Sequence, residues 1–507
     1  MEASFDFRNL FVLDLANNHQ GSVEHGLDVI RRHAAAVHKH GVRAAVKFQF
    51  RDLDTFVHPS HARESTNKHI PRFLSTRLSR DDYGKLFDEV KQQGLYTMCT
   101  PFDENSAATI AEMGFDLIKV ASCSAKDWPL IEAVTETNLP VVFSTGGLEI
   151  ADVDNLAVFA EHRALNLALM HCVSIYPTPP EACNLLNVAM LRKRYPSICI
   201  GWSTHEDPET IAPLQMAVAY GALLFERHIG VPTETVKLNA YSATPEQTDR
   251  WIEAWKLAQS LAGSYDRKTA LAKEAEALRS LQRGVFAKKP LKAGDLLERE
   301  DVFFAMPMQE GQLDSGHFGG GIVLTQDVAS DGPLMETGLV LPEPSDGQKL
   351  KRYVHHVKAI LNIAGIKLGP EFYVEYSHHY GIPNFGRTGC VLIDCVNREY
   401  CKKILVQLPG QSHPYHFHRL KEETFQVLWG EMYLNIDGDE RLLRPGDTAV
   451  VLPGAWHKFR TDRGCVVEEI STTHHNNDSV YKDPAINKLP REERKTVVKH
   501  WGRFEIN

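Results

Sequence analysis

The chain has 507 residues, of which 43% are apolar and 24% are charged, and its formal net charge is −9. This composition argues against nucleic acid or an anionic membrane as the main partner, and no apolar run approaches the ~20 residues of a membrane span. The nine cysteines are scattered, and the N-terminus carries no basic segment followed by an apolar one, so we expect a cytoplasmic protein with reduced thiols.

Eight short apolar runs rich in β-branched residues recur in the first half of the chain. They lie at 11–16, 44–49, 95–100, 117–122, 140–145, 167–172, 198–203 and 223–228. Most gaps between them carry an amphipathic helical pattern, as in residues 26–41 and 81–94. Apolar strands that alternate with such helices indicate a parallel α/β sheet, and eight units before residue 230 predict a (β/α)8 TIM barrel. A doubly wound open sheet is the alternative.

Polar residues gather at the ends of these strands, where such a barrel carries its chemistry. Lys47 and Lys119 stand inside apolar strands, and a buried ammonium group needs an anion. A phosphate held by both lysines and by strand-end hydroxyls would supply that anion. The hydroxyls are those of Thr100, Ser122, Ser144 and Ser203. Schiff-base chemistry at Lys119 is the competing interpretation.

Two histidines, His205 and His228, end the seventh and eighth strands, which are neighbours in a barrel. Two imidazoles with an acidic residue nearby can hold a divalent ion as a Lewis acid. Hydrogen-bonded core histidines are the alternative. Further strand-end candidates for substrate binding are Asn18, Gln49, Ser174 and Tyr176.

Eight sequence stretches carry a family resemblance over residues 10–250. They are NNHQG, AAVKFQ, CTPFD, IKVAS, FSTGG, HCVSIYPTPPEACNL, GWSTH and ERH. In this order they resemble the sialic acid synthase family, which condenses phosphoenolpyruvate with an open-chain sugar on a (β/α)8 barrel. The resemblance implies that the two lysines and four hydroxyls above bind phosphoenolpyruvate, and that His205 and His228 bind Mn or Mg. It also implies that Asp14 lies near the reacting centre and Tyr176 at the sugar.

The chain departs from the family where the sugar is bound. The usual glycine and acidic residue after the fourth strand are Cys123 and Ser124, and the family's GPDH stretch is replaced around Leu238 and Asn239. We therefore expect the same reaction on a different sugar, giving a 2-keto-3-deoxy acid of the nonulosonate type. Asp14, both lysines and both histidines are the predicted catalytic residues. A degenerate, inactive barrel is the alternative.

A small second domain is predicted after the barrel domain at 1–264. Residues 265–280 indicate a charged linker helix, and residues 281–340 carry short strands and a KAGD turn. The latter resemble the antifreeze-like (SAF) domain that follows the barrel in sialic acid synthases. The resemblance implies a homodimer with exchanged antifreeze-like domains, in which Arg283 reaches the partner's sugar site. An ordinary surface arginine is the alternative.

The third domain is predicted at 350–507, where short strands with tight turns indicate an all-β barrel or jelly roll. The segments at 410–430 and 446–457 resemble the two cupin motifs. The resemblance implies four metal ligands, which are His416, His418, Glu423 and His457. Three imidazoles and a carboxylate suit Mn, Zn, Fe, Co or Ni.

The sequence around the cupin motifs, including VEYSHHYGI and EEISTTHHNNDS, resembles sugar-isomerase cupins similar to D-lyxose isomerase. That resemblance implies that the cupin isomerises the sugar that the barrel consumes, with Glu468, Glu469 and His474 as candidate bases. A sugar-binding or oligomerisation module without turnover is the first alternative. A sugar sensor built from two inactive domains is the second.

Overall fold

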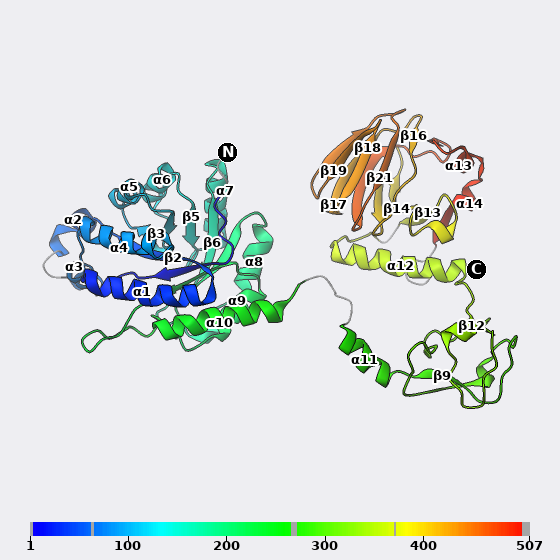
Figure 1. Cartoon of the computed structure of the whole chain (residues 1–507). Helices are drawn as coiled ribbons and strands as arrows, with labels where there is room; N and C mark the ends of the chain where they lie inside the picture. Colours follow the sequence, from blue (N-terminus) through cyan, green and yellow to red (C-terminus); the bar gives the residue numbers. More distant parts are fainter. Residues whose placement is uncertain (1–3, 62–64, 265–270, 370–371, 499–507) are drawn as a thin grey trace. The chain divides into compact units, whose positions relative to one another are not determined.

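The computed structural model describes residues 4–61, 65–264, 271–369 and 372–498 (Figure 1). The chain divides into two compact units, Met1–Lys268 and Thr269–Asn507, and each is described by itself. Among the described helices, none combines the length and apolar character that a membrane crossing needs.

The first unit is a closed barrel of eight parallel strands in chain order. The strands are β1 (Leu10–Asp14), β2 (Arg43–Phe50), β3 (Tyr96–Pro101), β4 (Leu117–Val120), β5 (Val141–Ser144), β6 (Leu167–Cys172), β7 (Cys199–Thr204) and β8 (Leu224–His228). β8 pairs with both β7 and β1, which closes the sheet. The predicted TIM barrel is confirmed, and the doubly wound alternative is wrong.

Helices surround this barrel (Figure 1). They are α1 (Val23–His40), α2 (Leu53–Phe56), α3 (Ile70–Ser75), α4 (Arg80–Gln92), α5 (Glu104–Met113), α6 (Trp128–Glu136), α7 (Ile150–His162), α8 (Leu186–Arg194), α9 (Ala212–Ala219) and α10 (Pro245–Ala262). Local sequence sets several ends: Ser22 caps α1, Gly41 ends it with φ 61°, and Ser79 and Asp82 form a capping box on α4. Their apolar faces pack on the outer side chains of the strands in one large core.

The barrel interior is apolar at one end and charged at the other. Because side chains alternate along a strand, Val12 and Asp14 share the inner face of β1, as Leu224 and Glu226 share that of β8. The amino-terminal half of the interior is filled by Leu10, Val12, Ala45, Met98, Leu117, Val142, Ala168, Met170 and Leu224. The inward polar side chains therefore collect at the carboxyl end, where such barrels carry their sites.

The second unit begins with a helix and a small β-rich region. These elements are α11 (Ala272–Leu281), β9 (Gly284–Ala287), β10 (Val302–Ala305), β11 (Val323–Leu324) and β12 (Leu339–Val340). The region has its own core, which includes Val285, Leu297, Val302 and Leu334. α11 lies largely in the predicted linker helix, of which residues 265–270 are outside the described residues. The antifreeze-like assignment and the domain boundaries stay predictions.

The remainder of the second unit is a two-sheet antiparallel cupin. One sheet has the order β20-β17-β22-β15-β14-β13-β24 and the other β19-β18-β21-β16-β23. The strands are β13 (Tyr373–Ser377), β14 (Cys390–Asn397), β15 (Tyr400–Gln407), β16 (His416–His418), β17 (Glu423–Gly430), β18 (Met432–Ile436), β19 (Asp439–Leu443), β20 (Thr448–Val451), β21 (His457–Arg460), β22 (Cys465–Thr472), β23 (Ser479–Tyr481) and β24 (Lys495–Val498). Two short helices, α13 (Pro484–Lys488) and α14 (Arg491–Arg494), precede β24. The predicted β-rich cupin fold is confirmed.

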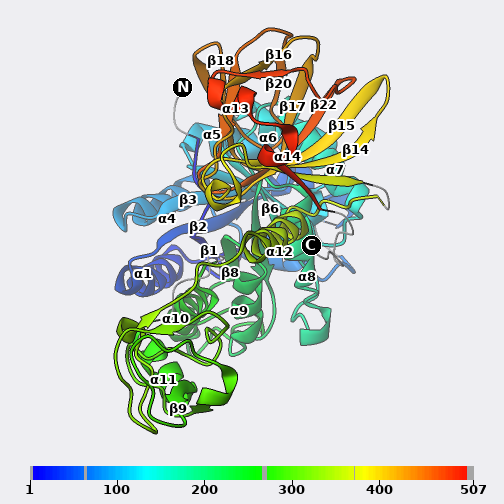
Figure 2. The ribbon, with the colours of Figure 1, turned by 90° about the vertical axis from the view of Figure 1, so that its right-hand side faces the viewer.

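One long helix was absent from the sequence prediction. α12 (Asp346–Ile363) lies against the seven-stranded sheet (Figure 1 and Figure 2). Its buried Leu350, Val354, Val357 and Leu361 share a core with residues of β13 and β14. Its signals are the capping box at Ser345 and a helical apolar period.

Candidate functional site

Two lysines and two carboxylates meet at the carboxyl end of the barrel. Lys47 on β2 and Lys119 on β4 are almost fully buried. The Glu226 carboxylate lies between them: Lys47 Nζ is 3.0 Å from Oε2, and Lys119 Nζ is 2.8 and 2.7 Å from Oε1 and Oε2. Lys47 Nζ is also 3.1 Å from Asp14 Oδ2. The two lysine side chains thus converge on one anionic group.

Burial and the neighbouring charges set the protonation of this cluster. Burial opposes the charge of Lys47, but Asp14 and then Glu226 raise its pKa above the ordinary value. Burial also opposes the charge of Glu226, but Lys119 and then Lys47 lower its pKa well below the ordinary value. Burial lowers the pKa of Lys119, although Glu226 opposes that shift. Glu226 is therefore held as a carboxylate between the lysines.

The two barrel histidines lie beside this cluster. The ring centroids of His205 and His228 are 5.4 Å apart, and Tyr176 lies 4.3 Å from His205. His228 Nδ1 is 3.2 Å from Asp14 Oδ2, and His205 Nδ1 is 2.9 Å from the Val173 carbonyl. Burial lowers the pKa of His228 to about 4, so its ring is neutral at pH 7. A neutral imidazole is the form that binds a metal.

Hydroxyl groups complete the carboxyl end of the barrel. Ser203 donates a hydrogen bond to Glu226 Oε1 at 2.9 Å, and Thr100 Oγ1 is buried without a partner among the described residues. Ser122 and Ser174 converge on Gly146, where an added Cβ would lie 2.8 and 2.7 Å from their oxygens. Gly146 therefore leaves the room that these two hydroxyls occupy.

In the part of the chain that the structure describes, the other predicted site residues make no hydrogen bond or ion pair with the lysines or the histidines. Asn18 donates hydrogen bonds to Ile229 O and Ser242 Oγ, which is a structural role. Ser124 and Ser144 are buried at the ends of β4 and β5, whereas Gln49 accepts a hydrogen bond from Arg51. Arg283, in the second unit, is exposed beside Phe304.

The sequence prediction missed the role of Glu226. Glu226 was not among the predicted site residues, yet its carboxylate contacts both lysines and Ser203. The available signal was its place two residues before His228, which puts both side chains on the inner face of β8.

A second polar centre lies inside the cupin. His416 and His418 come from β16 and His457 from β21, with His416 paired to His457 in register. Among the described residues, these histidines form the group of three potential metal ligands whose ligand atoms lie within 4.8 Å of one another. Glu423 Oε1 is 3.2 Å from His418 Nε2, and its Oε2 is 3.1 Å from His457 Nε2.

The donors of this cupin centre fit a metal ion. The Nδ1 atoms of His416 and His457 lie 3.0 and 3.1 Å from the carbonyls of Pro414 and Ala455, and His418 Nδ1 lies 3.3 Å from Ser479 Oγ. These contacts leave each Nε2 directed inward, as in metal-binding histidines. His457 Nε2 and Glu423 Oε2 are buried and lie close to each other, but among the described residues neither forms a hydrogen bond, and a cation would satisfy both atoms.

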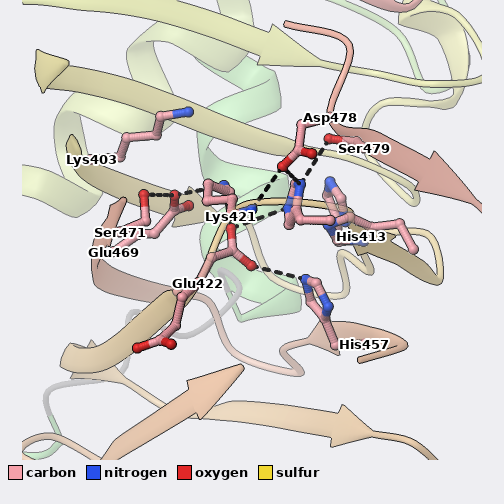
Figure 3. Close-up of polar contacts among 12 residues, drawn as sticks. Lys403, His413, Lys421, Glu422, His457, Glu469, Ser471, Asp478 and Ser479 are labelled. Carbon is pink, nitrogen blue, oxygen red and sulfur yellow. Dashed lines mark hydrogen bonds and ion pairs between the residues drawn. The ribbon is translucent and has the colours of Figure 1, made fainter. Parts of the chain in front are cut away.

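A buried ammonium group borders the cupin centre (Figure 3). Lys421 contacts Glu423 and lies 3.0 Å from Glu469 Oε1, which also accepts a hydrogen bond from Ser471 at 3.3 Å. Asp478 accepts hydrogen bonds from three successive backbone amides, Arg419 to Lys421, and so fixes the loop between β16 and β17. Glu469 thus belongs to the centre, whereas Glu468 pairs with Lys402.

The fold and the two sites define the class of protein: a (β/α)8 barrel with a buried pair of lysines, joined in one chain to a cupin that carries three potential metal ligands. Family comparison matches residues 34–267 to the NeuB family and residues 404–467 to the cupin domain. A solved structure from Chromobacterium violaceum, assigned to spore coat polysaccharide biosynthesis protein E, is 41% identical. Its alignment covers 66% of this chain and 100% of that one, with a TM-score of 0.63. The chain belongs to the NeuB family.

Curated relatives agree with this assignment. The spore coat polysaccharide biosynthesis protein SpsE of Bacillus subtilis is 27% identical, over 58% of this chain and 83% of that protein. The N-acetylneuraminate-9-phosphate synthase of Drosophila melanogaster is 32% identical, over 43% of this chain and 59% of that protein. Both alignments are shorter than this chain, which carries the additional cupin.

Proposed function

We propose that the barrel condenses phosphoenolpyruvate with the aldehyde of an open-chain sugar, giving a 2-keto-3-deoxy sugar acid and phosphate. The observation that carries this proposal is the pair of buried ammonium groups, Lys47 and Lys119, converging on one carboxylate beside Asp14 and His228. A phosphate and a carboxylate on one small molecule are the anions that such a pair would hold. Membership of the NeuB family supports the same reaction.

The chemistry balances with these groups. The methylene carbon of phosphoenolpyruvate attacks the sugar aldehyde, so one carbon–carbon bond forms and the aldehyde oxygen takes up a proton. Water adds to the cationic C2, and Asp14 is positioned to accept its proton. Breaking the bond between C2 and the ester oxygen then releases phosphate, which takes the proton of the C2 hydroxyl group, and leaves the ketone; the proton from water that Asp14 accepts balances the one taken up by the aldehyde oxygen. Lys47 and Lys119 stabilise the phosphate charge throughout.

His205 and His228 would hold a divalent ion, Mn or Mg, which supplies polarisation of the aldehyde when bound. The two rings are close and neutral His228 fits that role. Tyr176 and Ser174 lie where the loop after β6 meets these rings, and they would orient the sugar. Arg283 would contact the sugar across a homodimer with exchanged antifreeze-like domains; its exposed guanidinium is compatible with that role.

The proposal is tested by a sugar panel. Purified protein with Mn is incubated with phosphoenolpyruvate and each of a set of hexoses, hexosamines and their phosphates, and phosphate and keto acid are measured. We expect equal amounts of both products with at least one sugar, and none without a sugar. Borohydride trapping of pyruvate on Lys119, with no phosphate release, would instead support the Schiff-base aldolase.

For the cupin we propose aldose–ketose isomerisation at the centre formed by the three histidines and Glu423. The favouring observation is the buried Lys421–Glu469 pair beside that centre, since a purely structural metal site does not require such charges. Glu469 would move a proton between C1 and C2 of the sugar. Deuterium uptake from heavy water into an aldose would support turnover. Sugar binding without deuterium uptake would favour the non-catalytic module.

A further inference from the structure

At the carboxyl end of the barrel, directly after β2, lies Arg51, which has no anionic partner among the described residues. Side chains two residues apart share one face of a strand, so Lys47 and Gln49 share the inner face of β2, and Arg51 follows directly after the strand ends at Phe50. Arg51 lies about 13 Å beyond Lys47 at the rise of an extended strand. The far end of an open-chain sugar whose aldehyde lies near Asp14 would extend toward this rim.

The Arg51 guanidinium is held firmly but not neutralised. It lies between two aromatic rings, 4.0 Å from the centroid of Phe73 and 3.6 Å from that of Phe102. Its Nη2 donates a hydrogen bond to Gln49 Oε1 at 3.1 Å, and its Nε is buried without a partner among the described residues. Burial without a contacting carboxylate lowers the pKa of Arg51 to about 10, so the cation is retained at pH 7.

The surroundings of Arg51 form a cavity of about 260 Å³ that includes Asn17 and Gln49 from the barrel mouth. Its two other arginines are already paired: Arg77 with Asp54 at 2.6 Å, and Arg80 with Glu112 at 2.9 Å. Among the described residues that line it, the acidic one is Asp52, which accepts a hydrogen bond from Asn105. Arg51 is thus, within that described lining, the cation that has no anionic partner.

From these contacts we propose that Arg51 binds an anionic substituent at the far end of the sugar, a phosphate ester or a carboxylate. The proposal rests on the condensation proposed above and names its substrate class: an acidic open-chain sugar rather than a neutral one. A guanidinium fixed between two rings presents its remaining N–H groups as a planar fork, which suits either anion. The rings hold the fork in place, so little side-chain entropy is lost on binding.

The experiment compares wild type, Arg51→Met, Arg51→Lys and the control Arg163→Met, which removes an exposed arginine outside the cavity that pairs with Glu132. Each is assayed for phosphate release with phosphoenolpyruvate and mannose 6-phosphate, N-acetylmannosamine 6-phosphate, mannuronic acid or the neutral parent sugars. We expect wild type to have a KM at least about tenfold lower for an acidic sugar than for its parent. Arg51→Met should remove that difference by raising only the KM of the acidic sugar, while the KM of phosphoenolpyruvate is unchanged.

The remaining outcomes separate the two proposals. Arg51→Lys should recover part of the preference, because it restores the charge without the fork, and Arg163→Met should behave as wild type. Comparing the KM of the sugar phosphates with that of mannuronic acid decides whether Arg51 binds a phosphate ester or a carboxylate. Equal use of neutral and acidic sugars by wild type would overturn the assignment of Arg51 and leave condensation standing. Phosphate release with no sugar at all would overturn both.

Discussion

At the scale of single residues, Glu226 explains how two lysines remain buried and charged. Ammonium groups in the interior are costly unless an anion compensates them, and Glu226 contacts both while Ser203 contacts Glu226. A substrate phosphate near these lysines would add a second anion to the same pocket. The carboxylate therefore influences both the stability of the barrel and its affinity for anions.

Replacing Glu226 by glutamine tests this role. We expect Glu226→Gln to destabilise the first unit by about 3–5 kcal/mol, because the two ammonium groups lose their shared counter-ion. Phosphoenolpyruvate should then stabilise the variant more than it stabilises wild type, since it supplies the missing anion. Thermal unfolding with and without phosphoenolpyruvate measures both effects.

Glu206→Gln is the matched control, because Glu206 forms a buried ion pair with Arg227 at 2.9 Å on the outer side of β8. The Glu206→Gln variant should also be less stable than wild type. Phosphoenolpyruvate should raise its unfolding temperature no more than it raises that of wild type. Equal increases in the two variants would contradict the counter-ion role of Glu226.

A strand end or a motif spacing marked the individual residues that the sequence proposed for the two sites, and their roles stay predictions. Lys47, Lys119, His205, His228 and the cupin histidines all lie in the predicted neighbourhoods. Contacts between groups far apart in the chain were not predictable from spacing alone. Glu226 meets Lys119 across 107 positions, and Arg51 depends on the rings of Phe73 and Phe102.

At the scale of elements, His33 joins α1 to its neighbours. Its buried ring lies 3.0 Å from Thr248 Oγ1 on α10 and 3.1 Å from the Gly230 carbonyl after β8. Alternation and helical period predicted the barrel strands and most covering helices. They did not predict contacts between neighbouring elements, such as those of His33. They also did not predict α12, whose apolar face packs against the sheet that it covers.

His33 gives the barrel a pH-dependent stability. Burial lowers its pKa to about 4, from an ordinary value near 6.5. The unfolded chain therefore binds the proton more readily, so the stability from neutral His33 is complete above pH ~6.5 and falls as the pH drops toward 4, by about 3 kcal/mol in total. Hydrogen exchange of the α1 amides between pH 7.5 and 4.5 measures this loss. His33→Gln should show a flatter pH dependence, and an unchanged slope would contradict the assignment.

At the scale of the whole molecule, the chain carries two polar centres in two separate units. The side chains of the barrel centre come from the ends of parallel strands. The histidines of the cupin centre come from β16 and β21, which are paired neighbours in one sheet. Local motifs in the sequence pointed to the residues of both clusters, whose functions stay predictions. Which sugar each centre would accept was not predictable, since that depends on loop side chains gathered by folding, as at Arg51.

The two centres should be separable by mutation. We expect His205→Ala to abolish phosphate release, because it removes one of the two histidines proposed to hold the metal ion that polarises the aldehyde. His416→Ala should spare phosphate release and lower the metal content of the purified chain. Phosphate assays and elemental analysis on both variants provide the measurement. Loss of phosphate release in both would argue against independent centres.

The hydrogen bonds at Nδ1 of the cupin histidines affect which substitutions this chain can accept during evolution. His416 and His457 are each oriented by a main-chain oxygen, of Pro414 and Ala455, and every amino acid supplies that atom. Substitutions at these two acceptors that keep the local backbone path would preserve the ring orientations. The arrangement of the three histidines can thus persist while substitutions of the surrounding residues change which ligand the cupin binds.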